Sequence, residues 1–414
     1  MKKKTLVIFT ALALLLSAVA VSGHASGYLD FFTGKNKKTV TITQEEYDRL
    51  SRYKKMDTIL QYVEQLYLEE PDVDKMIENA TRGLLYALED PYTFYYNEAE
   101  WNEMKEDDAG EYGGVGIQML GNGTDYSVTI TQVFRDSPAE KAGLRKGDRL
   151  VRVEDIEVDF YSMQNAVNIM RGVAGEEVEV EVKRGEDYLI FHITRDIIHV
   201  NRVEYTMLED QVGYIALHAF EGESEKEFSD ALNALKAQGA KSLIVDLRDN
   251  GGGWVKSASD IGDLFLDDGL LIYSEDRYGN REESRMTKGS DDIPLVMLVN
   301  GSSASSSEIL SGGLHDRGRA TLVGTKTYGK GIMQAVIPLS DDKDGFQMTY
   351  EQYFLPSGEK VHKVGITPDI IVEMPEEMEN RFFELGDMED PQLKAAWEAA
   401  KGLIPAQPES DISL

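Results

Sequence analysis

Two short runs of uninterrupted apolar residues constrain the fold of this chain most. They are Leu243–Val245 and Leu295–Val299. A strand with one face in water alternates apolar and polar residues, whereas a strand covered on both faces is apolar throughout. Helical patterns separate these runs in the region that begins near residue 203. We therefore predict a βα core in which a buried, mainly parallel sheet is covered by helices.

The regions before this core have different patterns. Residues 43–88 show apolar residues at helical spacing, and Thr43 with Glu46 forms a capping-box pattern. Residues 113–195 show short strands, since Val178, Val180 and Val182 alternate with glutamates. The fold class expected is thus a multidomain α/β protein with N-terminal helices, a β-rich module and the βα core. The predicted parts are 1–26 (signal peptide or membrane anchor), 27–42 (polar tether), 43–108 (helical region), 109–197 (β-rich module), 198–375 (core) and 376–414 (acidic tail with a helix near 392–403).

The N-terminus has the layout of an export signal. Three lysines precede an uncharged run from Thr5 to Val21, and small residues follow. The apolar run is also nearly long enough to span a bilayer, so either a cleaved signal or a retained anchor fits. We expect an exported, extracytoplasmic protein that is secreted or attached to the membrane by this segment.

Composition excludes several kinds of site. The chain has no cysteine, which removes thiol nucleophiles, disulfides and cysteine-ligated metals. No two of its six histidines stand at the i, i+4 spacing of a zinc hydrolase. The net charge of −31 disfavours nucleic acid as a partner. We expect no metal and no cofactor.

Polar or small residues follow the two apolar runs. Asp246–Gly253 comes after the first run and ends in three glycines. Glycines leave backbone N–H groups unobstructed, as an oxyanion hole requires, although a plain flexible turn would have the same composition. Asn300–Ile309 joins the second run to a helix and is rich in serine. A serine there lies where helix N–H groups favour negative charge, but we expect most of these serines only to cap the helix.

A third segment, Gly324–Gln334, places Lys330 between two glycines. It nearly matches a phosphate-binding loop, but Gly331 lacks the hydroxyl that such a loop needs for its metal ion. A lysine amine that is removed from water can instead lose its proton near neutral pH and accept the proton of a serine. Gln334 could orient that amine. These residues alone do not say which serine faces Lys330, and a Ser-His-Asp site using His315 lacks the G-x-S-x-G pattern.

The three segments together resemble the carboxy-terminal processing peptidases of the S41 serine peptidase class. The matching motifs are Asp246-Leu247-Arg248 with Asn250, Gly252 and Gly253, then Ser303–Ile309, then Lys330 with Gln334, in that order. The resemblance implies that Ser305 is the nucleophile, Lys330 the general base and Gln334 its orienter. It also implies an oxyanion hole from the N–H groups of Gly253 and Ser306. Ser306 replaces the usual alanine, and Gly251 is an additional glycine of the turn.

Residues from Gly113 to Arg195 resemble a PDZ domain. The segment Gly114-Val115-Gly116-Ile117 matches the loop that holds the terminal carboxylate of a peptide, which adds to the sheet as a strand. Arg171 occupies the place of an arginine that senses substrate in relatives. An ordinary solvated cation at the end of a helix remains the alternative for Arg171.

These features predict a serine endopeptidase that cuts proteins near their C-termini through a Ser-Lys dyad and an acyl-enzyme. Its partners are protein or peptide substrates with free C-termini, and the apolar stripe of residues 43–88 would allow a homodimer. The alternative is a catalytically silent, exported PDZ-type peptide-binding scaffold.

Overall fold

The computed structural model describes residues 41–403, apart from residues 110, 122–124, 135, 200–201, 288–289, 340–341, 376–377, 379–380 and 382. The chain divides after Ile77 into two compact units. The predicted export signal lies outside the described residues. Among the helices of the described part, none combines the length and the apolar character needed to cross a membrane.

The first unit consists of helices. These are α2 (Gln44–Ser51), α3 (Lys54–Leu66) and the start of α4 (Val73–Tyr86). The predicted capping box is confirmed, because the Thr43 N–H donates to the Glu46 carboxylate at 2.8 Å and the Glu46 N–H donates to the Thr43 hydroxyl at 3.1 Å. No residue of α2 or α3 is buried.

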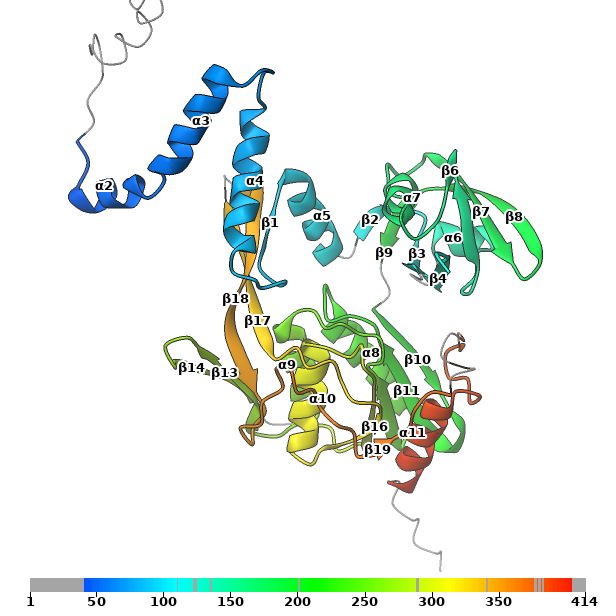
Figure 1. The fold of residues 1–414 in the computed structure, drawn as a ribbon. Coiled ribbons are helices and arrows are strands. Elements are labelled where there is room, and N and C mark those ends of the chain that lie inside the picture. The colour runs from blue at the N-terminus through cyan, green and yellow to red at the C-terminus, as the bar shows by residue number, and fades with distance from the viewer. Residues whose placement is uncertain are drawn as a thin grey trace, which may run out of the picture. The chain divides into compact units, whose positions relative to one another are not determined.

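A six-stranded sheet forms the core of the second unit (Figure 1). Its order is β10-β11-β12-β15-β16-β19, and every pair except β10–β11 is parallel. The predicted buried parallel strands are therefore confirmed. The strands are β10 (Val203–Met207), β11 (Val212–Leu217), β12 (Ser242–Asp246), β15 (Leu295–Val299), β16 (Ala320–Gly324) and β19 (Ile370–Ile371), and a short 3-10 turn, η1 (Glu209–Gln211), precedes β11.

Helices cover both faces of this sheet, which explains why its strands carry no polar alternation. Leu243 and Val245 of β12 pack in one apolar cluster with α8 (Ser224–Ala237), α9 (Val255–Asp263) and α10 (Ser306–Asp316). Ile244 packs in a separate cluster with α11 (Pro391–Gly402). In Figure 1 α11, in red, lies on the side of the sheet opposite to α8.

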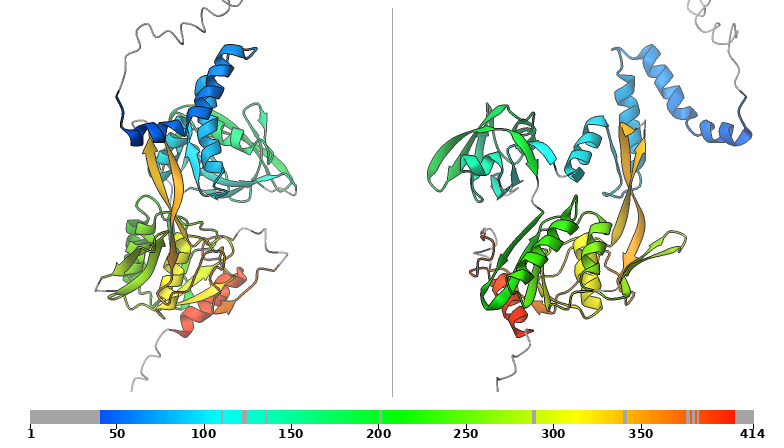
Figure 2. Two further views of the ribbon diagram at one scale, coloured as in Figure 1. Left: turned by 60° about the vertical axis from the view of Figure 1, so that its left-hand side comes forward. Right: turned by 180° about the vertical axis from the view of Figure 1, so that it is seen from behind.

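A second, antiparallel sheet extends from the core. Its path is β1-β18-β13-β14, with β17 paired to β18. Figure 2 shows β17 and β18 as a long two-stranded ribbon, in orange. The elements are β1 (Phe94–Tyr96), β13 (Gly269–Asp276), β14 (Arg281–Met286), β17 (Ile332–Leu339) and β18 (Asp344–Phe354), and α5 (Glu98–Ala109) follows β1.

The β-rich module has the predicted sheet, in the order β3-β4-β5-β7-β8 with β6 on β5. Val178, Val180 and Val182 of β7 are fully buried, so the alternation with glutamate is confirmed as a half-buried strand. β2 and β9 form a separate pair. The elements are β2 (Glu111–Gly114), β3 (Ile117–Gly121), β4 (Val128–Val133), α6 (Pro138–Ala142), β5 (Arg149–Val153), β6 (Ile156–Glu157), α7 (Met163–Met170), β7 (Glu177–Arg184), β8 (Asp187–Thr194) and β9 (Asp196–His199).

Candidate active site

Three loops meet at the carboxyl edge of the parallel sheet. They follow β12, β15 and β16, which are adjacent and in register. The carboxyl ends of adjacent parallel strands lie at one edge of a sheet, where ligands bind in open α/β folds. The topology thus brings the three segments singled out in the sequence to one place.

Ser305 has a strained backbone. Its φ is 54° and its ψ is −116°, and it directly precedes the first residue of α10. Such angles are costly for a residue other than glycine and persist only where the surroundings impose them. Gly252 lies directly against it, because a Cβ on Gly252 would come within 2.7 Å of the Ser305 Cβ. The serine is thereby held on a sharp bend beside the glycine turn.

The Gly253 N–H points toward this serine loop. The Gly252 carbonyl accepts from the Phe220 N–H at 3.0 Å, and the Trp254 N–H donates to the Phe220 carbonyl at 2.7 Å. In a trans peptide the N–H points opposite to the preceding carbonyl. The N–H and the carbonyl of Gly253 therefore both face away from Phe220. The Gly253 carbonyl accepts from the Ser306 hydroxyl at 2.8 Å, which places that side next to the start of α10.

Three serine hydroxyls join the serine loop to the glycine turn. Their expected role as helix caps is wrong, because each donates to a backbone carbonyl of the turn. The bonds are Ser303 to Leu247 at 2.7 Å, Ser307 to Asn250 at 2.9 Å and Ser306 to Gly253 at 2.8 Å. A hydroxyl can donate to a carbonyl only when the two groups are in contact, so the serine loop packs directly against the glycine turn.

Glu308, which the sequence analysis did not single out, connects the serine loop to the lysine loop. It is fully buried, and its carboxylate accepts four hydrogen bonds. The donors are the Ser305 N–H at 3.1 Å, the Thr327 hydroxyl at 2.5 Å, the Gly329 N–H at 2.7 Å and the Lys330 N–H at 2.8 Å. Burial raises the pKa of Glu308, and the four donors oppose that shift. The sequence did contain a signal for Glu308, since a glutamate three residues after a serine fits a capping box.

The same contacts argue against a phosphate-binding loop. In such a loop the backbone N–H groups point at the phosphates. Here the N–H groups of Gly329 and Lys330 donate to Glu308 instead. The lysine loop is therefore organised around a carboxylate of its own chain.

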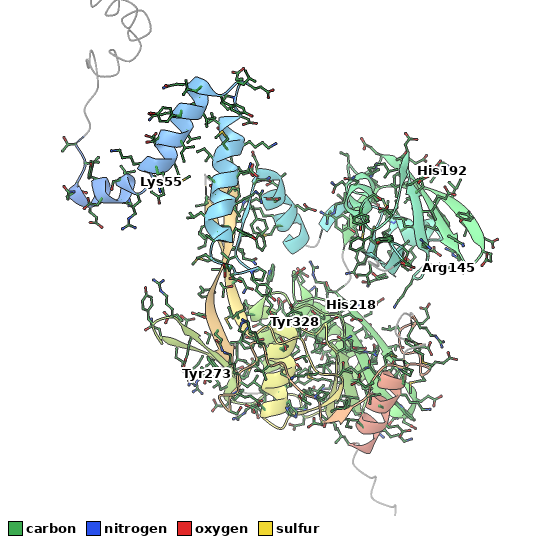
Figure 3. The ribbon with its side chains drawn as sticks, in the orientation of Figure 1. Lys55, Arg145, His192, His218, Tyr273 and Tyr328 are labelled. Carbon is green, nitrogen blue, oxygen red and sulfur yellow. The ribbon has the colours of Figure 1, made fainter. Side chains whose placement is uncertain are left out.

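The Lys330 side chain lies against an aromatic ring. Its Nζ is 4.6 Å from the centroid of Tyr92, and the Tyr92 hydroxyl lies 3.3 Å from that of Tyr328, which Figure 3 labels. Burial lowers the pKa of Lys330, while the carboxylates of Asp90 and Glu308 oppose this shift. The hydrogen bond with Tyr328 and, after it, burial raise the pKa of Tyr92 to about 12. Asp90 was not identified as a site residue from the sequence.

Backbone contacts bring Lys330 and Ser305 together. Besides sharing Glu308, their carbonyls both lie within reach of the Tyr353 hydroxyl, at 2.9 Å for Lys330 and 3.2 Å for Ser305. Tyr353 was also missed in the sequence. Gln334 lies on β17, where its Nε2 donates to the Thr349 hydroxyl at 3.3 Å.

His315 is not placed to assist Ser305. It stands near the far end of α10, where its Nε2 lies 2.9 Å from the Asp369 carboxylate. Ten residues of α-helix span about 15 Å. The Ser-His-Asp alternative is therefore not supported.

A buried ion cluster holds the beginning of the glycine turn. Arg248 pairs with Asp246 at 2.6 Å and with Asp390, the N-cap of α11, at 2.7 Å. The Tyr214 hydroxyl donates to Asp246 at 2.7 Å. Asp246 and Arg248, noted in the sequence as part of a motif, thus tie the turn to the last helix.

The predicted peptide-binding loop lies between β2 and β3. Gly114 ends β2, Val115 and Gly116 are buried, and Ile117 begins β3, which is an edge strand of its sheet. The Gly116 φ of 85° favours glycine. Arg171 is the C-cap of α7, with its guanidinium 4.8 Å from the Tyr112 ring centroid and 3.3 Å from the Glu103 carboxylate. It therefore has specific partners rather than only solvent.

Comparison with known families agrees with this geometry. The profile described as peptidase family S41 matches residues 211–372. A carboxy-terminal-processing protease of Bartonella bacilliformis is 34% identical over 91% of this chain and 89% of its own length.

The chain belongs to peptidase family S41. It is a carboxy-terminal processing serine protease with a PDZ domain, whose profile matches residues 129–184. The profile of the activating protease CtpB N-terminal domain matches residues 21–100 of this S41 peptidase. The predicted family, fold class and enzyme class are confirmed.

Other relatives of this S41 peptidase are similar over most of its length. The carboxy-terminal processing protease CtpA of Bacillus subtilis is 31% identical over 79% of this chain and 70% of its own. Among solved structures, the photosystem II D1 C-terminal processing protease has 28% identity and a TM-score of 0.54, covering 85% of this chain and 100% of its own.

Proposed function

We propose that this S41 peptidase cleaves proteins near their C-termini with Ser305 as nucleophile and Lys330 as general base. One observation carries the assignment. Ser305 stands on a strained bend beside Gly252, and its N–H shares the Glu308 carboxylate with the N–H of Lys330. A serine and a lysine whose backbones are tied to one buried group can work as a pair.

The proposed reaction needs only groups of this chain and water. The neutral Lys330 amine takes the proton of Ser305 as the hydroxyl oxygen bonds to the substrate carbonyl carbon. The N–H groups of Gly253 and Ser306 stabilise the oxyanion that forms. Lys330 then gives its proton to the departing amine, which leaves an ester on Ser305. Water hydrolyses the ester with Lys330 again as base.

The position of Lys330 on Tyr92 is consistent with this role. The amine must be uncharged to accept a proton, and burial already lowers its pKa. For the proposed proton transfer, its four-carbon side chain would have to turn from the Tyr92 ring to the Ser305 hydroxyl by rotation about single bonds. The amide oxygen of Gln334 would then accept a hydrogen bond from the ammonium that forms.

Substrate selection is proposed to use the PDZ domain. The terminal carboxylate binds the N–H groups of the loop Gly114–Ile117, and the peptide pairs with the open edge of β3. Arg171, held by Tyr112 and Glu103, is proposed to respond when that site is filled.

Three variants test the catalytic assignment. We expect Ser305→Ala and Lys330→Ala to abolish cleavage of a model protein, followed by mass spectrometry of its C-terminal fragments, while both remain folded. His315→Ala is the control and should keep full activity. Normal turnover by either of the first two variants would exclude the dyad, and an inactive wild-type protein that still binds peptides would favour the scaffold alternative.

Recognition of the C-terminus is tested with one substrate in two forms. A peptide amidated at its C-terminus lacks the charge that the loop binds, so its kcat/KM should fall at least about tenfold, the change that 1.4 kcal/mol produces. Equal kcat/KM values for the acid and the amide would exclude carboxylate recognition by the PDZ domain.

Export and self-association are further proposals. The N-terminal pattern of lysines and apolar residues supports an extracytoplasmic enzyme, secreted or attached through that segment. Cell fractionation with N-terminal sequencing distinguishes the two. The exposed apolar side chains of α3, among them Ile59 and Leu66, support a homodimer, which light scattering after size-exclusion chromatography would detect.

A further inference from the structure

The hydroxyl of Ser306 contacts the turn that carries the other proposed oxyanion donor. Ser306 is fully buried, and its Oγ donates to the Gly253 carbonyl at 2.8 Å. Its own backbone N–H is one proposed donor, and the N–H of Gly253 is the other. One residue therefore supplies a donor and holds the peptide next to the second donor.

The turn needs such a contact because its backbone is soft. Gly252 and Gly253 have φ values of 109° and 137°, and Gly251 precedes them. Glycine loses more conformational freedom on ordering than any other residue. Asn250 fixes the Gly252 N–H at 2.9 Å, and Phe220 holds the peptides on either side of Gly253 from one edge only. The Ser306 hydroxyl holds the Gly253 carbonyl on the side opposite to Phe220.

We propose that the Ser306 hydroxyl is a positioning group that sets the separation of the two oxyanion donors. It touches no reacting atom and acts through the Gly253 peptide. This inference rests on the proposed function, since it presumes that Gly253 and Ser306 bind the oxyanion.

Two neighbouring serines provide matched controls. Ser303 and Ser307 are fully buried and make the same kind of hydroxyl-to-carbonyl bond, to Leu247 and Asn250. The Leu247 and Asn250 carbonyls lie earlier in the turn than Gly253, whose N–H is the proposed oxyanion donor. The Asn250 carbonyl also accepts from the Ala304 N–H at 3.1 Å, so it keeps a partner when the Ser307 hydroxyl is removed. Loss of Ser307 costs a buried bond without releasing Gly253.

The experiment compares Ser306→Ala with Ser307→Ala. Removing an oxyanion donor lowers kcat about 100- to 1,000-fold, so a displaced donor should cost about tenfold or more. We expect Ser306→Ala to lower kcat by that factor with KM unchanged. The affinity for a peptide aldehyde, which forms a tetrahedral adduct, should fall by the same factor as kcat. Ser307→Ala should keep both values while losing a similar amount of thermal stability.

Each outcome separates the inference from the proposed function. If Ser305→Ala is inactive but Ser306→Ala equals Ser307→Ala in kcat and aldehyde affinity, the positioning role is overturned and the dyad stands. If Ser305→Ala retains turnover, the proposed function itself fails. Should Ser306→Ala not fold, Ser306→Cys keeps a similar volume with a weak donor and should show the same selective loss of kcat.

Discussion

At the scale of single residues, the proposed role of Lys330 as base makes activity depend on the charge state of its amine. The base must be neutral, so the rate should rise with pH as the ammonium loses its proton. Burial lowers the pKa of Lys330 and moves that rise below the ordinary range for lysine. Asp90 opposes the shift, because a carboxylate nearby favours the ammonium.

The first prediction concerns Asp90. Asp90→Asn removes a charge that raises the pKa of Lys330, so the acid limb of kcat/KM should move to lower pH. A pH profile measures it. Asp276→Asn is the control, since Asp276 accepts from an N–H two residues later, as Asp90 does, but in the β13–β14 turn. A limb that moves to higher pH in Asp90→Asn would contradict the assignment of Lys330 as base.

The second prediction concerns Glu308. Glu308→Gln keeps the shape but directs an NH₂ group at N–H or hydroxyl donors, which leaves at least one buried donor unpaired. We expect loss of about 2 kcal/mol or more in the free energy of unfolding, and a large fall in kcat. Denaturant titration measures the first. Glu283→Gln, on the exposed strand β14 with partners Arg281 and Arg285, should change the free energy of unfolding far less, because exposed ion pairs contribute little. Equal effects of the two variants would contradict a connecting role for Glu308.

Some residues of the candidate site could be predicted from the sequence and others could not, for a physical reason. Ser305, Lys330 and the glycine turn stand in short segments whose composition is unusual by itself. Tyr353 and Tyr92 reach the site from distant parts of the chain, through pairing that no local pattern encodes. Glu308 lay within a recognisable segment, but its four partners depend on how the lysine loop folds back.

At the scale of elements, the glycine turn shows how close packing selects residues. Gly252 faces the Ser305 Cβ, Gly253 faces the Phe220 backbone, and a Cβ on either would come within 2.7 Å of those atoms. Gly251 has open space around it. The three adjacent glycines thus differ in whether the structure has room for a side chain at their position.

The third prediction follows from this difference. Gly252→Ala should destabilise the protein by about 1–3 kcal/mol, because its φ is positive and its Cβ displaces Ser305. Peptidase activity should fall with it. Gly251→Ala is the matched variant and should stay near wild type in both thermal unfolding and turnover. If Gly251→Ala lowered thermal stability and turnover more than Gly252→Ala, the result would contradict the close packing of Gly252 against Ser305.

Elements were predictable where local pattern and burial agree. β12 and β15 are apolar throughout because helices cover both faces, and β7 alternates because one face is exposed. The antiparallel sheet was not identified. Its strand β14 is mostly exposed, and β18 pairs with β1, β13 and β17 from distant segments, so its pattern reflects no single buried face.

At the scale of the whole molecule, α11 connects the end of the described chain to the active-site edge. Asp390 caps α11 through the N–H groups of Gln392 and Leu393 and pairs with Arg248, which stands in the same loop as the glycine turn. Leu393 and Ala396 close the apolar face that includes Ile244. The last helix therefore supports both the sheet and the turn.

The fourth prediction tests this support. Asp390→Ala leaves the buried Arg248 with one carboxylate fewer and removes a helix cap, so unfolding should become easier by about 3 kcal/mol. Peptidase activity should decline as well, since the turn loses an anchor. Asp387→Ala, whose half-buried side chain accepts from the nearby Glu389 N–H at 2.9 Å, is the control. Calorimetry and a turnover assay that showed no difference between the variants would exclude the anchoring role.

Because α11 supports the glycine turn, we expect a newly made chain to become active only after this helix has formed. A ribosome makes Ser305 and Lys330 well before it makes Asp390 and the helix that follows. Until that helix emerges, one apolar face of the sheet is bare and Arg248 lacks its second carboxylate. A nascent chain in which α11 has not yet emerged should therefore be unable to digest its neighbours.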